Sequence, residues 1–350
     1  MTIKLSKKLK HIAVIRLSAM GDVAMTVPVI RAFVAQNPDT KITFVSRPFF
    51  KPFFDGIPNL EFFTFDAKER HKGFLGLIRL FDDLRKLDID AFADLHNVLR
   101  SKVVRKLFAL SGKKTASVDK GRAEKKALIR AENKIFKPVT SMFERHVKVF
   151  QELGFQIDLS NSVFPSKQNI DKEIIDLTGE KNQNWIGIAP FAQYDSKVYP
   201  QDLMQKVIDA LAENKSNKVL LFGGGNKEIQ TLNQFAKGKE DAIVIAGRIT
   251  FKQELQLISN LDVMLSMDSG NAHIAAMLGV KVITLWGATH PYAGFLPFNQ
   301  PLESALVSDR NQFPKLPTSV YGNKKVEGYE DAMRSILPEE IVEKINSNLG

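Results

Sequence analysis

Two aspartates stand between a predicted strand and a predicted helix, where a carboxylate can act on a bound substrate. Asp22 ends the segment Arg16-Leu-Ser-Ala-Met-Gly-Asp22 and precedes the helical pattern Val-Ala-Met-Thr-Val-Pro. Asp268 ends the apolar run Val263-Met-Leu-Ser-Met-Asp268. A positioned aspartate can be a general base, but aspartate is also among the best helix N-caps. Position alone favours the cap for Asp22 and leaves both roles open for Asp268.

The residues after Asp268 have the pattern of an anion-binding helix start. Ser269 and Gly270 would place consecutive backbone N–H groups at a helix N-terminus, and the glycine removes steric bulk. Such a site suits a diphosphate, to which Ser269 adds a hydroxyl donor. The alternative is that Asp268 or Ser269 only caps the helix and that His273 packs against the sheet.

Two further turns in the second half of the chain can border a ligand. Gly223 and Gly224 follow the predicted strand Leu220-Leu-Phe222, and glycines there let a nucleotide base or phosphate approach the backbone. Lys197 lies in the loop after Ile186-Gly-Ile-Ala189, where its ammonium group could neutralise phosphate charge. Glycine turns and solvent-facing lysines are common, so neither feature is specific alone.

Several chemistries lack the residues that they need. The chain contains no cysteine, which excludes disulfide scaffolds, thiolate zinc sites and thiol nucleophiles. It has no G-x-x-x-x-G-K-[ST] phosphate loop and no G-x-G-x-x-G after the first predicted strand, which removes the main support for an ATPase or a dehydrogenase. Metal-ligand spacings of histidines or carboxylates are also absent, so we expect no required metal.

Short apolar runs alternate with longer amphipathic segments, which is typical of α/β proteins with parallel sheets. A chain of 350 residues favours two domains. Two successive doubly wound units predict Rossmann-like domains facing a central cleft, with ligands at the carboxyl ends of the strands. The predicted strands are His11–Leu17, Lys41–Ser46, Glu61–Phe65, Ala91–Leu95, Thr115–Val118, Trp185–Ala189, Lys218–Phe222, Ala242–Ala246, Val263–Ser266 and Lys281–Trp286.

The predicted helices lie between these strands. Leu159–Asp171 has little periodicity and indicates a linker. Residues 328–348 predict a final helix. The other predicted helices are Asp22–Gln36, Phe74–Lys86, Val98–Ser111, Ser141–Leu153, Pro200–Glu213, Lys227–Ala236, Phe251–Asn260 and Asn271–Leu278.

The net charge of +10 is concentrated in the first half of the chain. Between Ala67 and Phe150 there are 21 Lys/Arg and 10 Asp/Glu, whereas the rest of the chain has 28 and 29. A partner that prefers positive charge would therefore meet the first half, although solvated helix surfaces could also explain the excess. We expect the aromatic group Phe49, Phe50, Phe53 and Phe54 to pack in a core rather than contact a membrane.

Nothing in the sequence predicts a membrane-spanning helix. The basic amino end, Met1 to Lys10, precedes only four apolar residues, Ile12 to Ile15, which is too short for a signal peptide. No apolar stretch reaches the length of about 18 residues that a spanning helix needs. We expect a cytoplasmic protein that at most rests on a membrane face.

Three motifs together resemble glycosyltransferase family 9, the ADP-heptose:lipopolysaccharide heptosyltransferases. They are Ser18-Ala-Met-Gly-Asp22 followed by Val27-Pro28, Lys197 before Tyr199-Pro200, and Asp268-Ser-Gly-Asn-Ala-His273-Ile-Ala-Ala276. Their order and separation match the family over nearly the whole chain. The combination is far more specific than any one motif, and it favours functional roles for Asp22 and Asp268 over capping alone.

The resemblance implies a GT-B fold built from two Rossmann-like domains. It assigns residues 1–163 to an acceptor-binding domain and residues 164–327 to a nucleotide-sugar-binding domain. Residues 328–350 would form a helix that packs back on the first domain. Members of the family invert the anomeric centre without a metal, so the resemblance implies no cofactor beyond the nucleotide-sugar substrate.

The resemblance also implies roles for individual residues. Asp22 would be the general base, and Lys197 would contact the donor phosphates or sugar. Ser269, Gly270 and Asn271 would bind the diphosphate, with Asp268 and His273 completing that motif. The other donor-site expectations are Gly223, Gly224 and Glu228, the last as a loose counterpart of a ribose-binding glutamate. The expected acceptor-binding residues are Ser18, Met20, Gly21, Arg100 and Arg122.

The implied reaction moves a heptose or related sugar from an ADP-activated donor to a lipid-linked core oligosaccharide. An anionic acceptor fits the basic first half, and the enzyme would be a monomer able to touch the cytoplasmic face of the inner membrane. Several family members carry cysteines where Leu306–Pro317 has none, which leaves the sugar open. Alternatives are a nucleotide-sugar epimerase of the same fold and a non-catalytic nucleotide-sugar-binding protein. No nucleic-acid-binding signature is present.

Overall fold

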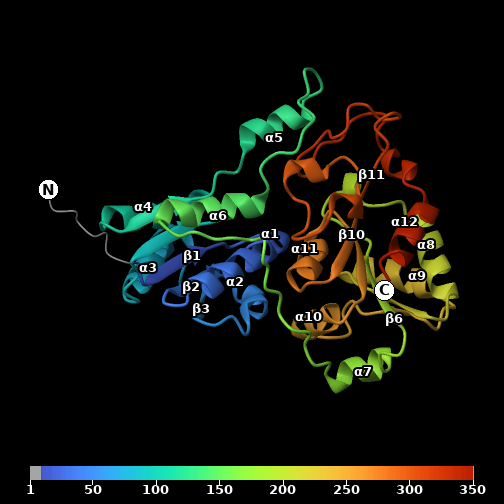
Figure 1. Cartoon of the computed structure of the whole chain (residues 1–350), viewed down its shortest axis with the longest axis horizontal. Helices are drawn as coiled ribbons and strands as arrows, with labels where there is room; N and C mark the ends of the chain where they lie inside the picture. The colour runs from blue at the N-terminus through green and yellow to red at the C-terminus, as the bar shows by residue number, and fades with distance from the viewer. Residues whose placement is uncertain (1–8, 350) are drawn as a thin grey trace. The chain divides into compact units, whose positions relative to one another are not determined.

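A computed structural model describes residues 9–349, which form two compact units (Figure 1). Residues 1–8, which hold most of the charged amino end, and residue 350 lie outside the described part. The first unit contains residues 9–120 and 142–163. The second contains residues 121–141 and 164–349. The segment 121–141 therefore belongs to the second unit although it lies between two elements of the first.

The first unit is built on a parallel sheet with the strand order β3-β2-β1-β4-β5. The order reverses at β1, which pairs with β2 on one side and β4 on the other. The place where the strand order reverses is called the switch point, and α/β sheets bind ligands there. The loops that follow β1 and β4 border this switch point. The strands are β1 (His11–Ile15), β2 (Lys41–Ser46), β3 (Leu60–Thr64), β4 (Ala91–Asp94) and β5 (Lys114–Ser117). The helices are α1 (Met20–Ala24), α2 (Val27–Gln36), η1 (Pro48–Phe54), α3 (Gly73–Arg85), α4 (Leu99–Leu110) and α6 (Met142–Leu153).

The second unit has a larger parallel sheet with the order β11-β10-β9-β6-β7-β8. Its switch point lies between β6 and β9, which pair directly. The strands are β6 (Asn184–Ala189), β7 (Asn217–Leu221), β8 (Ala242–Val244), β9 (Val263–Met267), β10 (Lys281–Trp286) and β11 (Ala305–Val307). The helices are α5 (Arg122–Ile129), α7 (Lys172–Thr178), η2 (Asp195–Lys197), α8 (Gln201–Glu213), α9 (Asn226–Ala236), α10 (Phe251–Ser259), α11 (Gly270–Met277), η3 (Pro291–Ala293), η4 (Leu302–Ser304), η5 (Ala332–Ser335) and α12 (Pro338–Asn346).

The predicted α/β class and all ten predicted strands are confirmed. The structure adds β11, a three-residue edge strand too short to show a pattern. It also divides the predicted helix Asp22–Gln36 into α1 and α2. The Thr26 hydroxyl donates to the Val23 carbonyl at 2.7 Å at this break. Pro28, which has no N–H, occupies the first turn of α2, where none is required.

The predicted bounds of the carboxyl-terminal helix were wrong. Only residues 338–346 form α12, because Pro338 is tolerated at a helix start but not inside a helix. The helix packs on α8 of the second unit. Ile341 and Ile345, four residues apart on one face, are fully buried in the core of the second unit.

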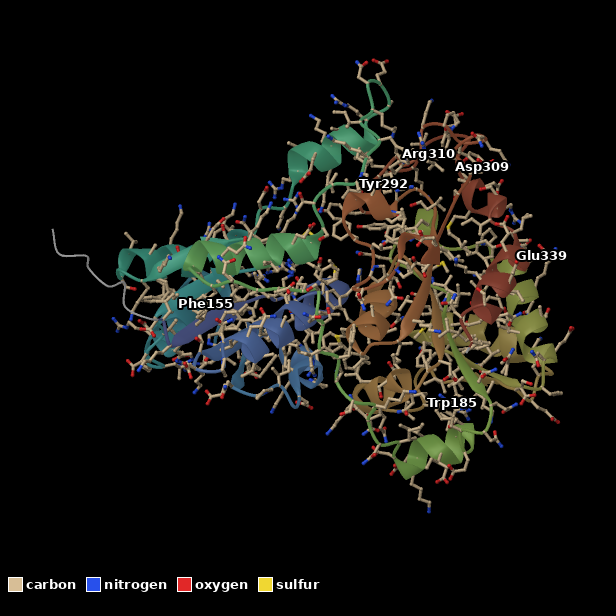
Figure 2. The ribbon with its side chains drawn as sticks, in the orientation of Figure 1. Phe155, Trp185, Tyr292, Asp309, Arg310 and Glu339 are labelled. Atoms are coloured by element: carbon tan, nitrogen blue, oxygen red, sulfur yellow. The ribbon has the colours of Figure 1, made fainter. Side chains whose placement is uncertain are left out.

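Aromatic side chains fill the cores of both units. Phe50, Phe53 and Phe54 are buried as expected, whereas Phe49 is exposed. Figure 2 marks Phe155 of the first unit, whose ring lies 5.0 Å from that of Phe33. It also marks Trp185, which is fully buried in the second unit. Burial of such large apolar surfaces is the main force that stabilises each unit.

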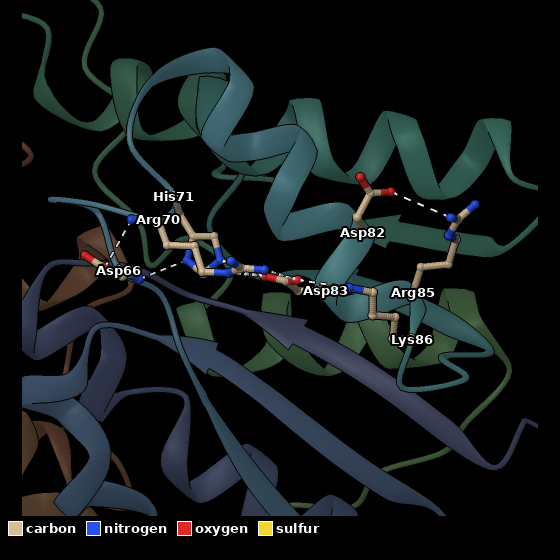
Figure 3. Close-up of polar contacts among 7 residues, drawn as sticks. All are labelled: Asp66, Arg70, His71, Asp82, Asp83, Arg85 and Lys86. Carbon is tan, nitrogen blue, oxygen red and sulfur yellow. Dashed lines mark hydrogen bonds and ion pairs between the residues drawn. The ribbon is translucent and has the colours of Figure 1, made fainter.

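A polar network fixes the segment that leads into α3 (Figure 3). Asp66 accepts hydrogen bonds from the backbone N–H groups of residues 68–70. His71 accepts one from the Asp66 N–H at its Nδ1 and contacts Asp83 Oδ2 through Nε2 at 3.3 Å. Arg70 makes a bidentate pair with Asp83, both contacts at 2.6 Å. The hydrogen bond from Arg70 is the main cause that lowers the pKa of Asp83 to about 2.

We predict that Asp83→Asn lowers the free energy of unfolding by about 1–3 kcal/mol at neutral pH, because it removes a charged hydrogen-bond acceptor. Asp82→Asn is the matched control, since its side chain is 47% exposed against 14% for Asp83 and meets Arg85 only at 3.8 Å. Because the folded pKa is depressed, this stabilisation is present above the unfolded pKa of 3.8 and disappears as the pH falls to about 2. Denaturant melts of both variants between these pH values measure the effect, and equal stabilities at pH 7 would contradict it.

Candidate functional site

Asp22 lies at the switch point of the first unit, in the first turn of α1. The N-cap of α1 is Ala19, so Asp22 is not the cap residue itself. Its Oδ2 instead accepts a hydrogen bond from the Ala19 N–H at 3.1 Å and meets Arg16 Nη2 at 2.6 Å. The Asp22 side chain is 33% exposed. The carboxylate is therefore held in a defined place and still accessible to a substrate hydroxyl.

Arg16 connects the two loops that border this switch point. Its guanidinium donates to the Ser18 carbonyl at 2.8 Å and to the Leu95 carbonyl at 2.7 Å, besides pairing with Asp22. The side chain is buried. A buried guanidinium with several fixed acceptors is a rigid support, so Arg16 positions the Asp22 carboxylate relative to the loop after β4.

His96, in the loop after β4, borders the same switch point and was missed by the sequence interpretation. It is only 8% exposed, and its Nδ1 has no hydrogen-bond partner among the described residues. Burial, followed by the positive charges of Arg16 and Lys120, lowers the pKa of His96 to about 3. The ring is therefore neutral at physiological pH. Its place after a strand at the switch point is the signal that could have identified it.

The turn that carries His96 is fixed by a buried carboxylate. Asp94 accepts hydrogen bonds from the N–H groups of His96 and Asn97 at 3.0 and 2.7 Å. The Asn97 side chain donates to the Val118 carbonyl at 2.7 Å. These bonds hold the turn between β4 and α4 against the neighbouring strand β5.

The expected acceptor-binding residues fall into different parts of the structure. Ser18, Met20 and Gly21 lie in the same turn as Asp22, as their spacing requires. Arg100 is exposed in the first turn of α4. Arg122 starts α5 and therefore belongs to the second unit.

Lys197 and Asp268 meet at the switch point of the second unit. Lys197 ends η2 in the loop after β6, and Asp268 follows β9 directly. Their Nζ and Oδ2 atoms are 2.9 Å apart, with side chains 13% and 9% exposed. A charge pair this well shielded is screened little by solvent. Asp268 therefore fixes where the Lys197 ammonium group points.

The Lys197 loop is packed tightly against segments from the end of the chain. Ser196 donates through its hydroxyl to the Gly322 carbonyl at 2.6 Å, and its own carbonyl accepts from the Ala288 N–H at 3.0 Å. A Cβ at Gly322 would stand 2.4 Å from Lys197 Cδ. Gly322 also has a φ of +83°, a conformation that favours glycine. The lysine stem thus requires a glycine above it.

The expected diphosphate motif begins α11 as predicted. Ser269 is its N-cap residue, and Gly270 and Asn271 form the first turn. The Ser269 and Ser266 hydroxyl oxygens are 3.1 Å apart. His273 is buried one turn further on. Backbone N–H groups of this first turn stand directly beside Asp268 in the chain.

Glu228 folds back onto the glycine turn after β7. Its Oε2 accepts a hydrogen bond from the Gly224 N–H at 2.7 Å and would lie 3.1 Å from a Cβ on Gly223. A cavity of about 380 Å³ opens beside it. Its walls include Phe191, Tyr199, Lys227 and Glu228. A carboxylate, a cation and two aromatic rings thus border one space in the second unit.

The segment 121–141 is attached to the second unit by cations on aromatic rings. Lys125 Nζ lies 4.0 Å from the centre of the Phe295 ring, and the Arg310 guanidinium lies 3.6 Å from that of Phe136. Figure 2 marks Arg310 and Tyr292, two of the residues that contact the Phe136 ring. These contacts explain why six cations of the basic first half, between Arg122 and Lys137, belong to the second unit.

Metal-binding clusters and membrane-spanning helices are both absent from residues 9–349. No group of three or more His, Asp or Glu side chains there could hold a metal ion. No helix in the same range has both the length and the apolar character needed to cross a membrane.

The comparisons with known proteins agree on one family. The model of glycosyltransferase family 9 (heptosyltransferase) matches residues 77–325, more than half of the chain. Lipopolysaccharide heptosyltransferase 3 of Escherichia coli K12 is 28% identical over 155 residues, which are 43% of this chain and 45% of that protein. The core heptosyltransferase OpsX of Haemophilus influenzae is 22% identical over 284 residues, 81% and 80% of the two chains. The solved ADP-heptose heptosyltransferase II of E. coli has a TM-score of 0.68 at 20% identity, covering 97% of this chain and 98% of that one.

Two Rossmann-like units with parallel sheets form the α/β architecture of the GT-B fold, as expected. The chain belongs to glycosyltransferase family 9, the heptosyltransferases. Its relatives are named as lipopolysaccharide or lipooligosaccharide heptosyltransferases, and one of them as a core heptosyltransferase.

We predict that Gly322→Ala displaces Lys197, lowering the melting temperature and slowing glycosyl transfer by about tenfold to a hundredfold. Gly328→Ala is the matched control. Gly328 has a similar φ of +78°, but a Cβ added there would have nothing within 4 Å, so it shares the backbone strain without the collision. Thermal melts and initial rates compare the two. Equal effects of both substitutions would show that the space above Lys197 is unimportant.

We predict that His96→Gln reduces the acid sensitivity of the fold. In the unfolded chain His96 takes up a proton near its ordinary pKa of 6.5, but in the folded protein only near about 3. The folded protein therefore loses stability as the pH falls from about 6.5 towards about 3. A glutamine at this position does not titrate, so the variant does not lose this part of the stability. At pH 8 the difference in melting temperature between the unchanged protein and His96→Gln reports the change in packing. At pH 4 the difference also includes the effect of protonating His96 in the unfolded chain. Parallel pH dependence of the two proteins would contradict the assignment.

Proposed function

We propose that the protein transfers a heptose or related sugar from an ADP-activated donor to an anionic, lipid-linked saccharide of the lipopolysaccharide core, with inversion and without a metal. The observation that carries the proposal is the fixed and accessible Asp22 carboxylate at the switch point of the first unit. The second unit supplies cationic and N–H groups suited to a diphosphate.

The acceptor hydroxyl reacts through Asp22. As the hydroxyl oxygen attacks the anomeric carbon, the Asp22 carboxylate takes its proton, and the bond from that carbon to the diphosphate oxygen breaks. Attack from the face opposite the leaving group inverts the anomeric centre in a single displacement. The carboxylate oxygen of such a base must lie within about 3 Å of the hydroxyl oxygen whose proton it takes. The contacts of Asp22 with Arg16 and Ala19 hold it ready for this step.

The leaving diphosphate gains negative charge as the bond breaks. Lys197 and the N–H groups of Gly270 and Asn271 stabilise that charge more in the transition state than in the bound donor, which is what accelerates the reaction. Asp268 keeps the Lys197 ammonium group in place before the donor arrives. Because the base and these groups belong to different units, each unit supplies one half of the chemistry.

The remaining assignments concern recognition. Glu228 borders the cavity of about 380 Å³, which we assign to part of the donor nucleoside, and the Gly224 N–H donates to the Glu228 carboxylate. Ser18, Met20 and Gly21 surround the base and would contact the acceptor. The neutral ring of His96 has an Nδ1 without a hydrogen-bond partner among the described residues, and this atom suits a sugar hydroxyl. We expect a monomer that works at the cytoplasmic face of the inner membrane and needs no cofactor.

We predict that Asp22→Asn lowers turnover by about 10²–10⁴-fold, the usual contribution of a positioned base. Donor affinity should change by no more than a few-fold, because the donor groups lie in the other unit. Asp55→Asn, an exposed aspartate of the first unit, is the control and should leave turnover unchanged. Radiolabelled sugar transfer gives the rate, and thermal shift with ADP gives the binding. Unchanged turnover of Asp22→Asn would remove the assigned base.

The same assay separates the proposal from its alternatives. An epimerase would convert a labelled nucleotide sugar in the absence of any acceptor. A binding protein would show the thermal shift without any product. Either result would overturn the transfer reaction.

A further inference from the structure

One helix of the first unit, α4, lies within a long stretch of sequence that has no acidic residues. Residues 95–118, which include α4 and β5, contain six Lys/Arg and no Asp or Glu. Arg100, Lys106 and Lys114 are exposed. Most surface helices carry both signs of charge, whereas this segment adds only positive charge to the surface of the first unit.

The outward face of α4 also carries apolar side chains. Val104 and Phe108 point into the core. On the opposite side Leu99 and Leu110 are 79% and 85% exposed. They are eleven positions apart, about 16 Å along a helix. Lys106, which is exposed, lies between them on the same helical stripe. A helix whose exposed side carries leucines together with lysine is typical of membrane-surface helices.

The start of α3 extends this apolar surface. Phe74 and Leu75 are 66% and 67% exposed. Helices α3 and α4 pack side by side (Figure 1), with the rings of Phe81 and Phe108 5.0 Å apart. Both follow the carboxyl ends of parallel strands, so both begin at the same edge of the sheet. Phe74 and Leu75 therefore stand at the same end of the helix pair as Leu99.

The network of Figure 3 keeps the start of α3 in place. The Asp66, Arg70, His71 and Asp83 contacts fix the chain that enters the helix. A Cβ at Gly76 would lie 2.2 Å from the backbone carbon of His71, so the first turn of α3 packs closely on this segment. The exposed Phe74 and Leu75 are thus presented by a rigid support.

We propose that this surface docks the protein on an anionic lipid bilayer. We name it the α3–α4 face and define it by Phe74, Leu75, Leu99, Leu110 and the cations Lys72, Arg79, Arg100 and Lys106. Apolar side chains enter the interface while the cations meet lipid phosphates. The exposed carboxylate of α3, Asp82, lies in the last turn beside Arg85, at the opposite end of the helix from Phe74 and Leu75. Lipid is the occupant that matches both the apolar and the positive character.

Docking on lipid does not depend on the transfer reaction. It concerns the free protein and a lipid surface, and it needs neither donor nor acceptor. If the acceptor is lipid-linked, docking brings the first unit to the surface that holds it. The two proposals can therefore fail separately.

Vesicle co-sedimentation of the full chain tests the proposal. The protein should bind vesicles of phosphatidylethanolamine and phosphatidylglycerol, bind phosphatidylcholine vesicles much more weakly, and be released by high salt. The double variant Leu99→Gln/Leu110→Gln should bind about tenfold more weakly, because its apolar contacts are lost. Lys106→Glu should weaken binding to anionic vesicles only.

Leu337→Gln is the matched control. Leu337 is 51% exposed in the second unit, next to Glu339 and Glu340, where an anionic bilayer would be repelled. This variant should bind vesicles like the unchanged protein. Far-UV circular dichroism and the ADP thermal shift establish that each variant is folded.

Three results would overturn the proposal. The first is an unchanged protein that binds neither kind of vesicle, and the second is a Leu99/Leu110 variant that binds as well as Leu337→Gln. The third is sedimentation equilibrium showing a dimer that the Leu99/Leu110 variant abolishes, since the face would then bind a second copy. Vesicle binding without sugar transfer would leave the docking proposal intact and overturn only the proposed reaction.

Discussion

The ion pair between Lys197 and Asp268 is the constraint around which the second unit is arranged. Removing one partner of a buried pair typically costs about 3–5 kcal/mol, because the other charge is left without compensation. Here the two residues follow different strands, β6 and β9, which are neighbours only in the folded sheet. The glycine above the lysine stem and the hydrogen bonds of Ser196 follow from the need to hold that ammonium group. A cation held in this way is already organised for a leaving diphosphate.

The first unit also has an ion pair at its switch point, but here the group presented to a ligand is the carboxylate rather than the cation. Arg16 is buried and Asp22 is partly exposed, so the pair presents a carboxylate where the second unit presents a cation. In both units the pair lies at the point where the strand order reverses. Parallel strands diverge there and leave room for a ligand at their carboxyl ends. One architectural rule thus places a proposed base in one unit and proposed anion-binding groups in the other.

Much of this could be predicted from the chain. The alternation of apolar runs indicates the two parallel sheets, and the motifs around Asp22, Lys197 and Asp268 stand next to predicted strand ends. His96 was missed because a single histidine after a strand has no distinctive spacing, and only burial beside Arg16 gives it an unusual pKa. The final helix was predicted to begin ten residues before Pro338, where it starts in the structure, because an apolar pattern alone does not fix the first residue of a helix. The place of α5 in the second unit could not be predicted either, because the contacts of Lys125 with Phe295 and of Arg310 with Phe136 join residues that are far apart in the chain.

The sequence by itself determined the α/β class, the strands and the family, because these depend on local periodicity and on short motifs of fixed order. It also determined that Asp22 and Asp268 stand at helix starts. Only the tertiary structure decided that Arg16 holds Asp22, that Asp268 holds Lys197, and that Gly322 closes over the lysine stem. The physical reason is that these partners are distant in the chain or on different strands, so their contacts depend on sheet order and packing, which no local pattern records.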